Sequence, residues 1–324
     1  MMENLLEIKN LNVYFCLENR VARVLEGVSL EIKSGEVLAL VGESGCGKTV
    51  LGLSILKLVP PPGRIVGGEI IFAGKDLLGL SEREIQNLRG KEIAMVFQEP
   101  LTSLNPVLSI GYQMREMFIF HLKISKKEAQ QRAEELLSRV GFSQPEVILE
   151  SYPHQLSGGM RQRAMLAMNL SGNPKFLILD EPTTALDTTI QAQILELILK
   201  IKKEMRLTAL FITHDLAIVK EIADKVAIMY LGKIVEIGKT AEIFQNPFHP
   251  YTQRLFACLL ELNEPRTLLK TIPGQVPQAI NRPSGCPFHP RCERKLEVCI
   301  EEFPPETKIT ESHLVWCHNP GFRK

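Results

Sequence analysis

The stretch "VLALVGESGCGKT", residues 37–49, decides the fold. Its first five residues are apolar and predict a short buried strand, and the apolar "VLGLSIL" that follows the stretch predicts the start of a helix. A glycine-rich loop that joins a strand to a helix in this way is typical of a phosphate-binding site. The residues of this loop are Gly42, Glu43, Ser44, Gly45, Cys46, Gly47, Lys48 and Thr49.

The residue types of the loop match the chemistry of nucleotide binding. Glycines allow backbone N–H groups to point at phosphate oxygens, and the N-terminus of the following helix adds its positive dipole end. We expect Lys48 to reach the β- and γ-phosphates of ATP and the Thr49 hydroxyl to ligate Mg²⁺. Cys46 is interpreted as a small residue that fits the loop, without a redox role.

A second apolar segment, "FLILDEP" at residues 176–182, ends in two carboxylates. Parallel strands deliver such side chains at their carboxyl ends, where ligands bind in open α/β sheets. We therefore expect Asp180 to hold Mg²⁺ and Glu181 to polarise the attacking water. Together with the glycine-rich loop, this pair predicts a nucleotide hydrolase.

The composition sets the class of protein. A length of 324 residues suggests about two domains, and 45% hydrophobic and 23% charged residues are ordinary globular values. A net charge of +1 gives no bulk attraction to nucleic acid or to an anionic membrane. The N-terminus shows no secretory signal, and no apolar run reaches the ~18 residues that span a bilayer. We expect a cytoplasmic protein whose seven cysteines are free thiols or metal ligands.

A third segment, which contains two adjacent glycines, lies between the other two. In "QLSGGMRQRAMLAMNL", Ser157, Gly158 and Gly159 precede a predicted helix. This segment resembles the signature motif of ABC-type ATPases. Backbone N–H groups, a hydroxyl and a helix dipole would form a second anion site there.

Further segments resemble the same family. Gln98 in "MVFQEP" resembles its Q-loop, residues 184–187 ("TALD") its D-loop, and His214 in "LFITHDL" its switch histidine. With the segments above, six motifs follow in the order of the family between residues 5 and 250. The resemblance implies that Gln98 reaches Mg²⁺ and the attacking water, and that His214 contacts the γ-phosphate.

The resemblance also implies a composite site. Ser157 and Gly159 of one subunit would cap the γ-phosphate that Lys48 of another subunit holds, in a head-to-tail dimer. The family register of "NLNVYF" implies that the adenine ring stacks on Phe15 rather than on Tyr14. Only one of the two rings can stack, since neighbours on a strand point to opposite faces. Simple packing of both aromatic rings is the alternative.

The fold implied by the resemblance is an α/β phosphate-loop core over residues 5–250, of the ABC nucleotide-binding type. It would contain an antiparallel β portion near the N-terminus and an inserted helical subdomain at about residues 101–172, which docks a membrane partner. "EPLTSLNP", directly after Gln98, is similar to the form found in peptide-transport members. Residues 251–324 would form a small C-terminal extension.

The C-terminal extension carries four cysteines. "HPY" (residues 249–251) and "SGCPFHPRC" resemble the C-terminal extension of oligopeptide/dipeptide transporter ATPases, a group that also handles nickel. A segment this short needs a cross-link or a metal to be stable. The spacing and the resemblance favour a 4Fe–4S cluster, with Zn²⁺ or unligated thiols as alternatives. The proposed ligands are Cys286, Cys292, Cys299 and Cys317.

The remaining cysteines and histidines receive plainer interpretations. Cys16 and Cys258 lie in apolar surroundings and are interpreted as small buried residues. We expect His289, His313 and His318 to lie around the thiols or at the surface, without ligating a metal.

The sequence thus predicts the ATP-hydrolysing subunit of an ABC importer for di- or oligopeptides, peripheral at the cytoplasmic face of the membrane. Its partners would be a second ATPase subunit, identical or different, two transmembrane permease subunits and, indirectly, an extracytoplasmic solute-binding protein. Import of nickel or another small solute is one alternative. A soluble ABC ATPase acting on nucleic acid or ribosomes is another, but the chain has neither a long coiled-coil insertion nor a second cassette.

Overall fold

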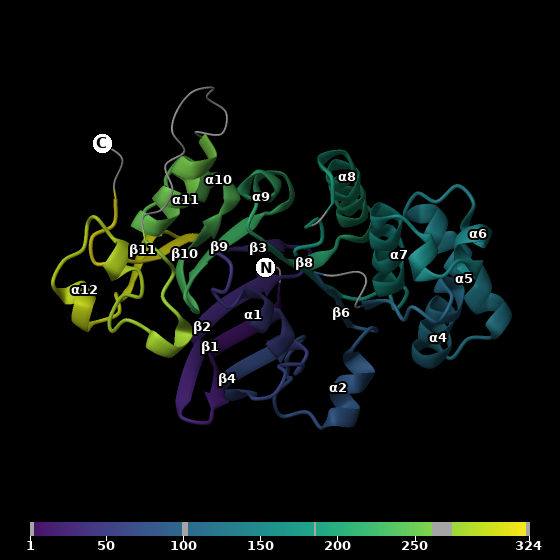
Figure 1. Cartoon of the computed structure of the whole chain (residues 1–324), viewed down its shortest axis with the longest axis horizontal. Helices are drawn as coiled ribbons and strands as arrows, with labels where there is room; N and C mark the ends of the chain where they lie inside the picture. The colour runs from purple at the N-terminus through teal and green to yellow at the C-terminus, as the bar shows by residue number, and fades with distance from the viewer. Residues whose placement is uncertain (1–2, 99–102, 185, 261–273, 322–324) are drawn as a thin grey trace. The chain divides into compact units, whose positions relative to one another are not determined.

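The computed structural model describes residues 3–98, 103–184, 186–260 and 274–321 (Figure 1). The chain forms two compact units, one of Met1–Leu78 with Phe211–Lys324 and the other of Gly79–Leu210. Across the described residues, no helix is long and apolar enough to cross a membrane.

The first unit contains the antiparallel sheet expected near the N-terminus. Its strands are β1 (Asn4–Leu17), β2 (Arg20–Lys33), β4 (Gly63–Phe72) and β5 (Lys75–Asp76), in the order β2-β1-β4-β5. Apolar residues of β1 and β2 form a buried face, while polar residues occupy the other face. The buried residues include Leu6, Ile8, Leu11, Val13, Leu25 and Val28.

The second sheet of this unit positions the glycine-rich loop. β3 (Val37–Val41) is buried at every residue and pairs in parallel with β9 (Lys225–Tyr230), which pairs antiparallel with β10 (Lys233–Lys239). An apolar strand without alternation is typical of one covered on both faces. The loop follows β3 directly and leads into α1 (Lys48–Ile55), so the strand, loop and helix predicted for residues 37–55 are confirmed.

The other elements of the first unit are mostly short. The helices are α9 (Leu216–Ile222), α10 (Thr240–Gln245), α11 (Pro250–Leu260) and α12 (Val298–Glu301). Single 3₁₀ turns are η3 (Ala279–Asn281) and η4 (His289–Arg291). The division between the two units falls within β8 (Thr208–Thr213), whose residues are all buried.

The C-terminal extension adds two strands to the second sheet. β11 (Glu306–Thr310) pairs antiparallel with β12 (His313–Trp316), and β12 pairs with β10. Because backbone hydrogen bonds join β12 to β10, this part of the extension is continuous with the sheet that carries the glycine-rich loop.

Glu236 of β10 anchors the extension from inside the unit. Its carboxylate is fully buried, accepts hydrogen bonds from the N–H groups of Phe248 (2.7 Å) and His249 (2.9 Å), and lies 2.8 Å from Nε2 of His313. The expectation that His313 lies around the thiols or at the surface is therefore wrong. The cost of burying a carboxylate requires such partners, and the imidazole supplies one of them.

The second unit contains a pair of parallel strands and most of the helices. β6 (Ile93–Val96) and β7 (Phe176–Asp180) are buried at every residue and pair in parallel. The helices, with one 3₁₀ turn, are α2 (Glu82–Leu88), α4 (Ile110–Leu122), α5 (Lys126–Arg139), α6 (Pro145–Glu150), η1 (Pro153–Gln155), α7 (Gly158–Leu170) and α8 (Thr188–Met205). The run from α4 to α7 lies within the range predicted to be helical.

Side-chain caps fix where these helices begin. The side chains of Ser109, Ser125, Ser157 and Asp187 accept hydrogen bonds from backbone N–H groups in the first turns of α4, α5, α7 and α8. On α5, Ala129, Ala133 and Leu137 are buried, as the helical spacing of apolar residues predicts.

Replacing Glu236 by Ala should detach the C-terminal extension. The change leaves two backbone N–H groups and the His313 ring without their buried acceptor, which should lower the free energy of unfolding by roughly 3 kcal/mol. Chemical denaturation measures the loss, and hydrogen exchange should become faster at Phe248 and His249. Glu311→Ala, at an exposed position of the same extension, is the control and should have little effect. Equal stability of the two variants would contradict the anchoring role.

Candidate functional site: a nucleotide-binding loop and its partners

The glycine-rich loop is closed around the ammonium group of Lys48. Lys48 Nζ lies 2.7 Å from the carbonyl oxygen of Gly42 and 3.2 Å from that of Glu43, and the residue is buried. Gly45 and Gly47 have φ angles of 78° and 107°, in the left-handed region that suits glycine. These two turns fold the loop so that its own carbonyl oxygens contact the Lys48 ammonium group.

Close packing explains a third glycine of the loop. A Cβ atom at Gly42 would lie 2.2 Å from the carbonyl oxygen of Met229 and 2.7 Å from Sγ of Cys46. The N–H of Gly232 donates to the carbonyl of Cys46 at 2.8 Å, which ties the loop to the turn after β9. Cys46 is buried, and this burial raises the pKa of its thiol, which agrees with a small neutral residue filling the loop.

The carboxylates at the end of β7 lie in the second unit. Asp180 is buried at the last position of the strand. Glu181 follows with a φ of 45°, an uncommon conformation for a residue with a side chain and one that is often kept at functional sites. Its Oε2 accepts hydrogen bonds from Thr184 Oγ1 at 2.9 Å and from Gln98 Nε2 at 3.2 Å. The structure thus brings Gln98 and Glu181 together.

The signature segment forms the N-terminus of α7. The Ser157 hydroxyl is exposed and accepts a hydrogen bond from the N–H of Met160 at 3.3 Å. Gly159 is buried against α8, and a Cβ atom there would lie 2.5 Å from Cγ2 of Ile190. An exposed hydroxyl and the N-terminus of a helix of 13 residues have the features of an anion site.

The other predicted residues lie at the ends of elements. His214 is exposed directly after β8, and Asp215 beside it caps α9 by accepting from the N–H of Ala217 at 2.8 Å. Thr49 is exposed at the second position of α1.

The two aromatic residues of β1 have different neighbours. The Phe15 ring packs over Gly63, where a Cβ atom would lie 2.7 Å from its Cζ. The guanidinium group of Arg23 instead lies over the Tyr14 ring, 5.8 Å from the ring centroid. Stacking of adenine on Phe15 stays a prediction.

Residues predicted to act on one nucleotide fall in both units. Lys48, Thr49 and His214 belong to the first unit, while Gln98, Asp180, Glu181 and the signature segment belong to the second. Residues 99–102 of "EPLTSLNP" and residue 185 of "TALD" lie outside the described residues.

Comparison with known proteins agrees with this geometry. The family described as "ABC transporter" matches residues 25–184, and the family described as "Oligopeptide/dipeptide transporter, C-terminal region" matches residues 235–299. The chain is 48% identical to the oligopeptide transport ATP-binding protein OppD of Bacillus subtilis, over 99% of this chain and 90% of that protein. It is 45% identical to the dipeptide transport ATP-binding protein DppD of Escherichia coli, over 98% of this chain and 97% of that protein.

The chain belongs to the ABC transporter ATP-binding proteins of the oligopeptide/dipeptide type. A solved ATP-binding cassette, a dimer in a post-hydrolysis state with ADP and Pi, is similar in fold. It superposes with a TM-score of 0.66 at 27% identity and covers 72% of this chain and 98% of its own. The α/β phosphate-loop fold of the ABC type, predicted from the motifs, is therefore confirmed.

Three of the four cysteines of the extension belong to or pack against one apolar cluster of the first unit, namely Cys286, Cys292 and Cys299. Cys286 and Cys299 are buried, and the N–H of Cys286 donates to the carbonyl of Cys299 at 2.9 Å. Burial raises the pKa of Cys286 to about 12 and that of Cys317 to about 11, and charge on the neighbouring thiols, Cys292 among them, adds to both shifts.

The same thiols are not arranged as a metal site. Among the described residues, no group of three or more His, Cys, Asp or Glu side chains could hold a metal ion. The structure therefore supports neither the 4Fe–4S cluster nor the zinc alternative.

The interpretation of Cys16 as buried is wrong, because it lies at the exposed end of β1, near the hairpin to β2. The side chain of Cys258 lies outside the described residues.

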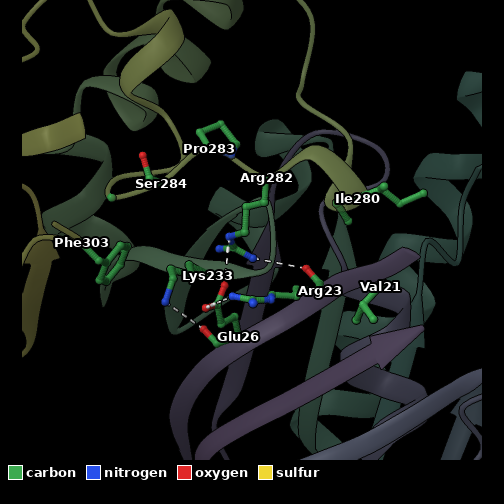
Figure 2. A pocket seen from close by; sticks show the side chains of 11 residues that line it. Val21, Arg23, Glu26, Lys233, Ile280, Arg282, Pro283, Ser284 and Phe303 are labelled. Atoms are coloured by element: carbon green, nitrogen blue, oxygen red, sulfur yellow. Dashed lines mark hydrogen bonds and ion pairs between the residues drawn. The ribbon is translucent and has the colours of Figure 1, made fainter. Parts of the chain in front are cut away.

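A hollow of about 530 Å³ lies where the extension meets β2 (Figure 2). Arg282 crosses it, with Nε 3.1 Å from a carboxylate oxygen of Glu26 and Nη1 donating to the carbonyl of Arg23 at 3.3 Å. Lys233 Nζ donates to the carbonyl of Glu26 at 3.2 Å and lies 4.2 Å from the centroid of the Phe303 ring. These contacts fasten the extension to the N-terminal sheet.

Two residues of the extension reach the glycine-rich loop itself, and sequence reasoning assigned neither of them a role. The hydroxyl of Tyr251 accepts a hydrogen bond from the N–H of Glu43 at 2.9 Å. The guanidinium of Arg291 lies 2.7 Å and 3.1 Å from the two carboxylate oxygens of Glu43. The segments "HPY" and "CPFHPRC" contain these residues, so the only signal in the sequence was the resemblance of both segments to the transporter extension.

The two glycines of the signature should differ in their tolerance of a methyl group. Gly159→Ala should lower the free energy of unfolding by about 1–3 kcal/mol, because its Cβ would collide with Ile190 and separate α7 from α8. Gly158→Ala is the matched control, because the nearest atom to its Cβ is Cδ2 of Leu186 at 3.5 Å. Thermal unfolding compares the two variants. If both were equally stable, the packing explanation for Gly159 would be wrong.

Proposed function

We propose that this ABC protein is the ATP-hydrolysing subunit of an importer for di- and oligopeptides. The observation that carries the proposal is the similarity to OppD, which extends over 99% of the chain and so includes the extension as well as the nucleotide-binding part. The relatives are oligopeptide and dipeptide transport ATP-binding proteins, and these names favour peptides over nickel or another small solute as cargo. The match to the transporter C-terminal region favours transport over a soluble ABC ATPase.

ATP would bind with its phosphates in the glycine-rich loop. Lys48 would exchange the carbonyls of Gly42 and Glu43 for β- and γ-phosphate oxygens. Thr49, Gln98 and Asp180 would hold Mg²⁺, and their hydroxyl, amide and carboxylate oxygens are the hard donors that this ion prefers. The ion would neutralise charge on the phosphates during hydrolysis.

Glu181 would act as the general base that takes a proton from the attacking water. Its strained backbone and the hydrogen bonds from Gln98 and Thr184 hold the carboxylate in one orientation, which supports this role. Gln98 would thereby connect Mg²⁺ to the base, and His214 would contact the γ-phosphate. Phe15 would stack on adenine.

The signature would complete the site of a second subunit. The exposed Ser157 hydroxyl, with Gly158, Gly159 and the N-terminus of α7, would cap the γ-phosphate held by Lys48 of another ATPase subunit in a head-to-tail dimer. ATP would favour the closed dimer because it contacts both subunits, and hydrolysis would remove that link. The description of the solved cassette as dimeric supports an assembly of two ATPase subunits.

The wider assembly follows from this role. The partners would be a second ATPase subunit, identical or different, two transmembrane permease subunits docked through the helical subdomain, and an extracytoplasmic solute-binding protein that acts indirectly. The subunit would lie at the cytoplasmic face of the membrane and bind no nucleic acid. Residues 5–250 would form the nucleotide-binding domain and residues 251–324 the extension.

The thiols of the extension would hold a 4Fe–4S cluster, with zinc as the alternative. Cysteine thiolates are the usual ligands of such clusters, and none of the four cysteines forms a disulfide. They would have to close around the cluster, because their present arrangement is not that of a metal site. The cluster would staple the extension, and ATP hydrolysis would proceed without its taking part.

Glu181→Gln should abolish most hydrolysis while it preserves binding. The amide cannot accept the proton of water, so turnover of Mg·ATP should fall by about a hundredfold or more, and the ATP-bound dimer should accumulate. Steady-state phosphate release and sedimentation in Mg·ATP provide the two measurements. Glu150→Gln, at an exposed position of the same unit, should hydrolyse ATP normally. Wild-type turnover by Glu181→Gln would exclude the role as base.

Protein purified without oxygen should be brown and contain roughly four irons and as many acid-labile sulfides per chain. Replacing Cys286, Cys292, Cys299 or Cys317 by Ser should reduce the iron content, whereas Cys16→Ser and Cys46→Ser should not. Metal and sulfide analysis of each variant is the measurement. One zinc without iron would support the alternative, and four freely alkylated thiols without metal would exclude both.

A further inference from the structure

Glu43, the second residue of the glycine-rich loop, is held at three of its groups. Its N–H donates to Tyr251, its carbonyl accepts from Lys48 Nζ, and its carboxylate pairs with Arg291. Lys48 belongs to the loop, but Tyr251 and Arg291 come from the region after residue 245. The extension thus fixes the backbone and the charge of a residue inside the predicted phosphate site.

The pair of Arg291 and Glu43 is partly removed from water. The side chain of Arg291 is 5% exposed and that of Glu43 is 25% exposed. Both guanidinium nitrogens Nη1 and Nη2 contact carboxylate oxygens, and Nη1 also lies 3.3 Å from the Tyr230 hydroxyl. A two-point contact of this kind is stronger and more directional than an exposed ion pair. It leaves the Glu43 carboxylate neutralised beside the place where phosphates would bind.

The second contact comes from a rigid aromatic group. Tyr251 is fully buried, and its ring centroid lies 4.7 Å from that of Tyr230 and 5.3 Å from that of Phe288. Burial raises the pKa of Tyr251 well above its ordinary value, so the hydroxyl stays neutral and can accept the N–H of Glu43. Packed rings cannot follow the loop if it moves, and they therefore hold this peptide group in one orientation.

The position of Arg291 depends on the fold of the cysteine-containing segment. Arg291 ends η4, where its N–H donates to the carbonyl of Phe288 at 3.0 Å. Cys292 follows it directly, and the N–H of Cys286 before it is bonded to Cys299. A change in the fold of this segment would move the guanidinium away from Glu43.

We propose that Arg291 and Tyr251 are positioning residues of the nucleotide site, through which the extension sets the affinity of the glycine-rich loop for ATP. The inference rests on the proposed binding of ATP at this loop. Without Arg291, the Glu43 carboxylate would stand uncompensated next to the phosphates and repel them. Coupling between two sites is reciprocal, so bound nucleotide must also stabilise the folded extension.

The first test measures the Kd of Mg·ATP for the full chain by equilibrium titration. Arg291→Gln should bind about tenfold more weakly, and Arg291→Lys, which keeps the charge but not the two-point contact, should fall between this variant and the wild type. The matched control is Arg294→Gln. Arg294 bonds only to Asn319 and Pro320 among the contacts described for it, so its removal should leave the Kd unchanged.

A double variant separates charge from general structural damage. In Glu43→Gln/Arg291→Gln no carboxylate remains to be neutralised, so the Kd should return to within about threefold of the wild-type value. If Arg291 served only to keep the extension folded, the double variant would bind as weakly as Arg291→Gln. That result, or an unchanged Kd in Arg291→Gln, would overturn the inference. If Arg291→Gln does not fold, Tyr251→Phe provides a separate test: loss of the acceptor of the Glu43 N–H should weaken binding of Mg·ATP, and an unchanged Kd would overturn the inference.

The reciprocal test follows hydrogen exchange at the backbone N–H groups of Cys286 and Arg291, which are bonded to Cys299 and Phe288, so that the readout does not depend on the state of the thiols. Saturating Mg·ATP should slow this exchange several-fold in the wild type and have a smaller effect in the double variant, which keeps only the Tyr251 contact. Absence of protection in a wild-type chain that binds Mg·ATP would overturn the coupling alone. A wild-type chain that bound no Mg·ATP would overturn the proposed function and this inference together.

Discussion

The carbonyl oxygen of Met229 leaves no room for a side chain at position 42, and much of the first unit depends on this close contact. It brings the end of β3 against β9, so the loop that follows must turn immediately and without a Cβ. The later glycines at 45 and 47 turn it back over the Lys48 ammonium. A loop built in this way presents backbone dipoles to an anion at little further entropic cost, because the surrounding strands have already ordered it.

Polar contacts explain why the extension is part of the first unit. β12 lengthens the sheet through β10, the buried Glu236 of β10 lies 2.8 Å from Nε2 of His313 of β12, and Arg282 joins the extension to β2. Each contact brings polar groups out of water, and each is compensated by a partner on the other segment. The extension is consequently held by specific polar pairs as well as by the apolar cluster around Tyr251 and Phe288.

Local patterns in the sequence were enough to predict the strands and helices that carry the motifs. The unbroken apolar runs at 37–41 and 176–180 are buried strands, as their composition predicts. Long-range polar pairs could not be predicted, because nothing in the sequence near His313 indicates that it pairs with Glu236, which lies 77 residues earlier. The prediction that Cys16 is buried was wrong for a related reason. An apolar neighbourhood in the sequence does not reveal that the hairpin end of β1 lies outside the core.

The pairing of Glu43 with Arg291 shows why such distant contacts matter for chemistry. An acidic residue inside a phosphate-binding loop is unfavourable when the loop is considered alone, since its charge opposes that of the ligand. The sequence explains it only when residues 248 positions apart are considered together, because the compensating cation belongs to the segment with the cysteines. The acid therefore gives the extension a point of control over the loop: the charge is harmless to phosphate binding while the extension is folded, and repulsive when it is not.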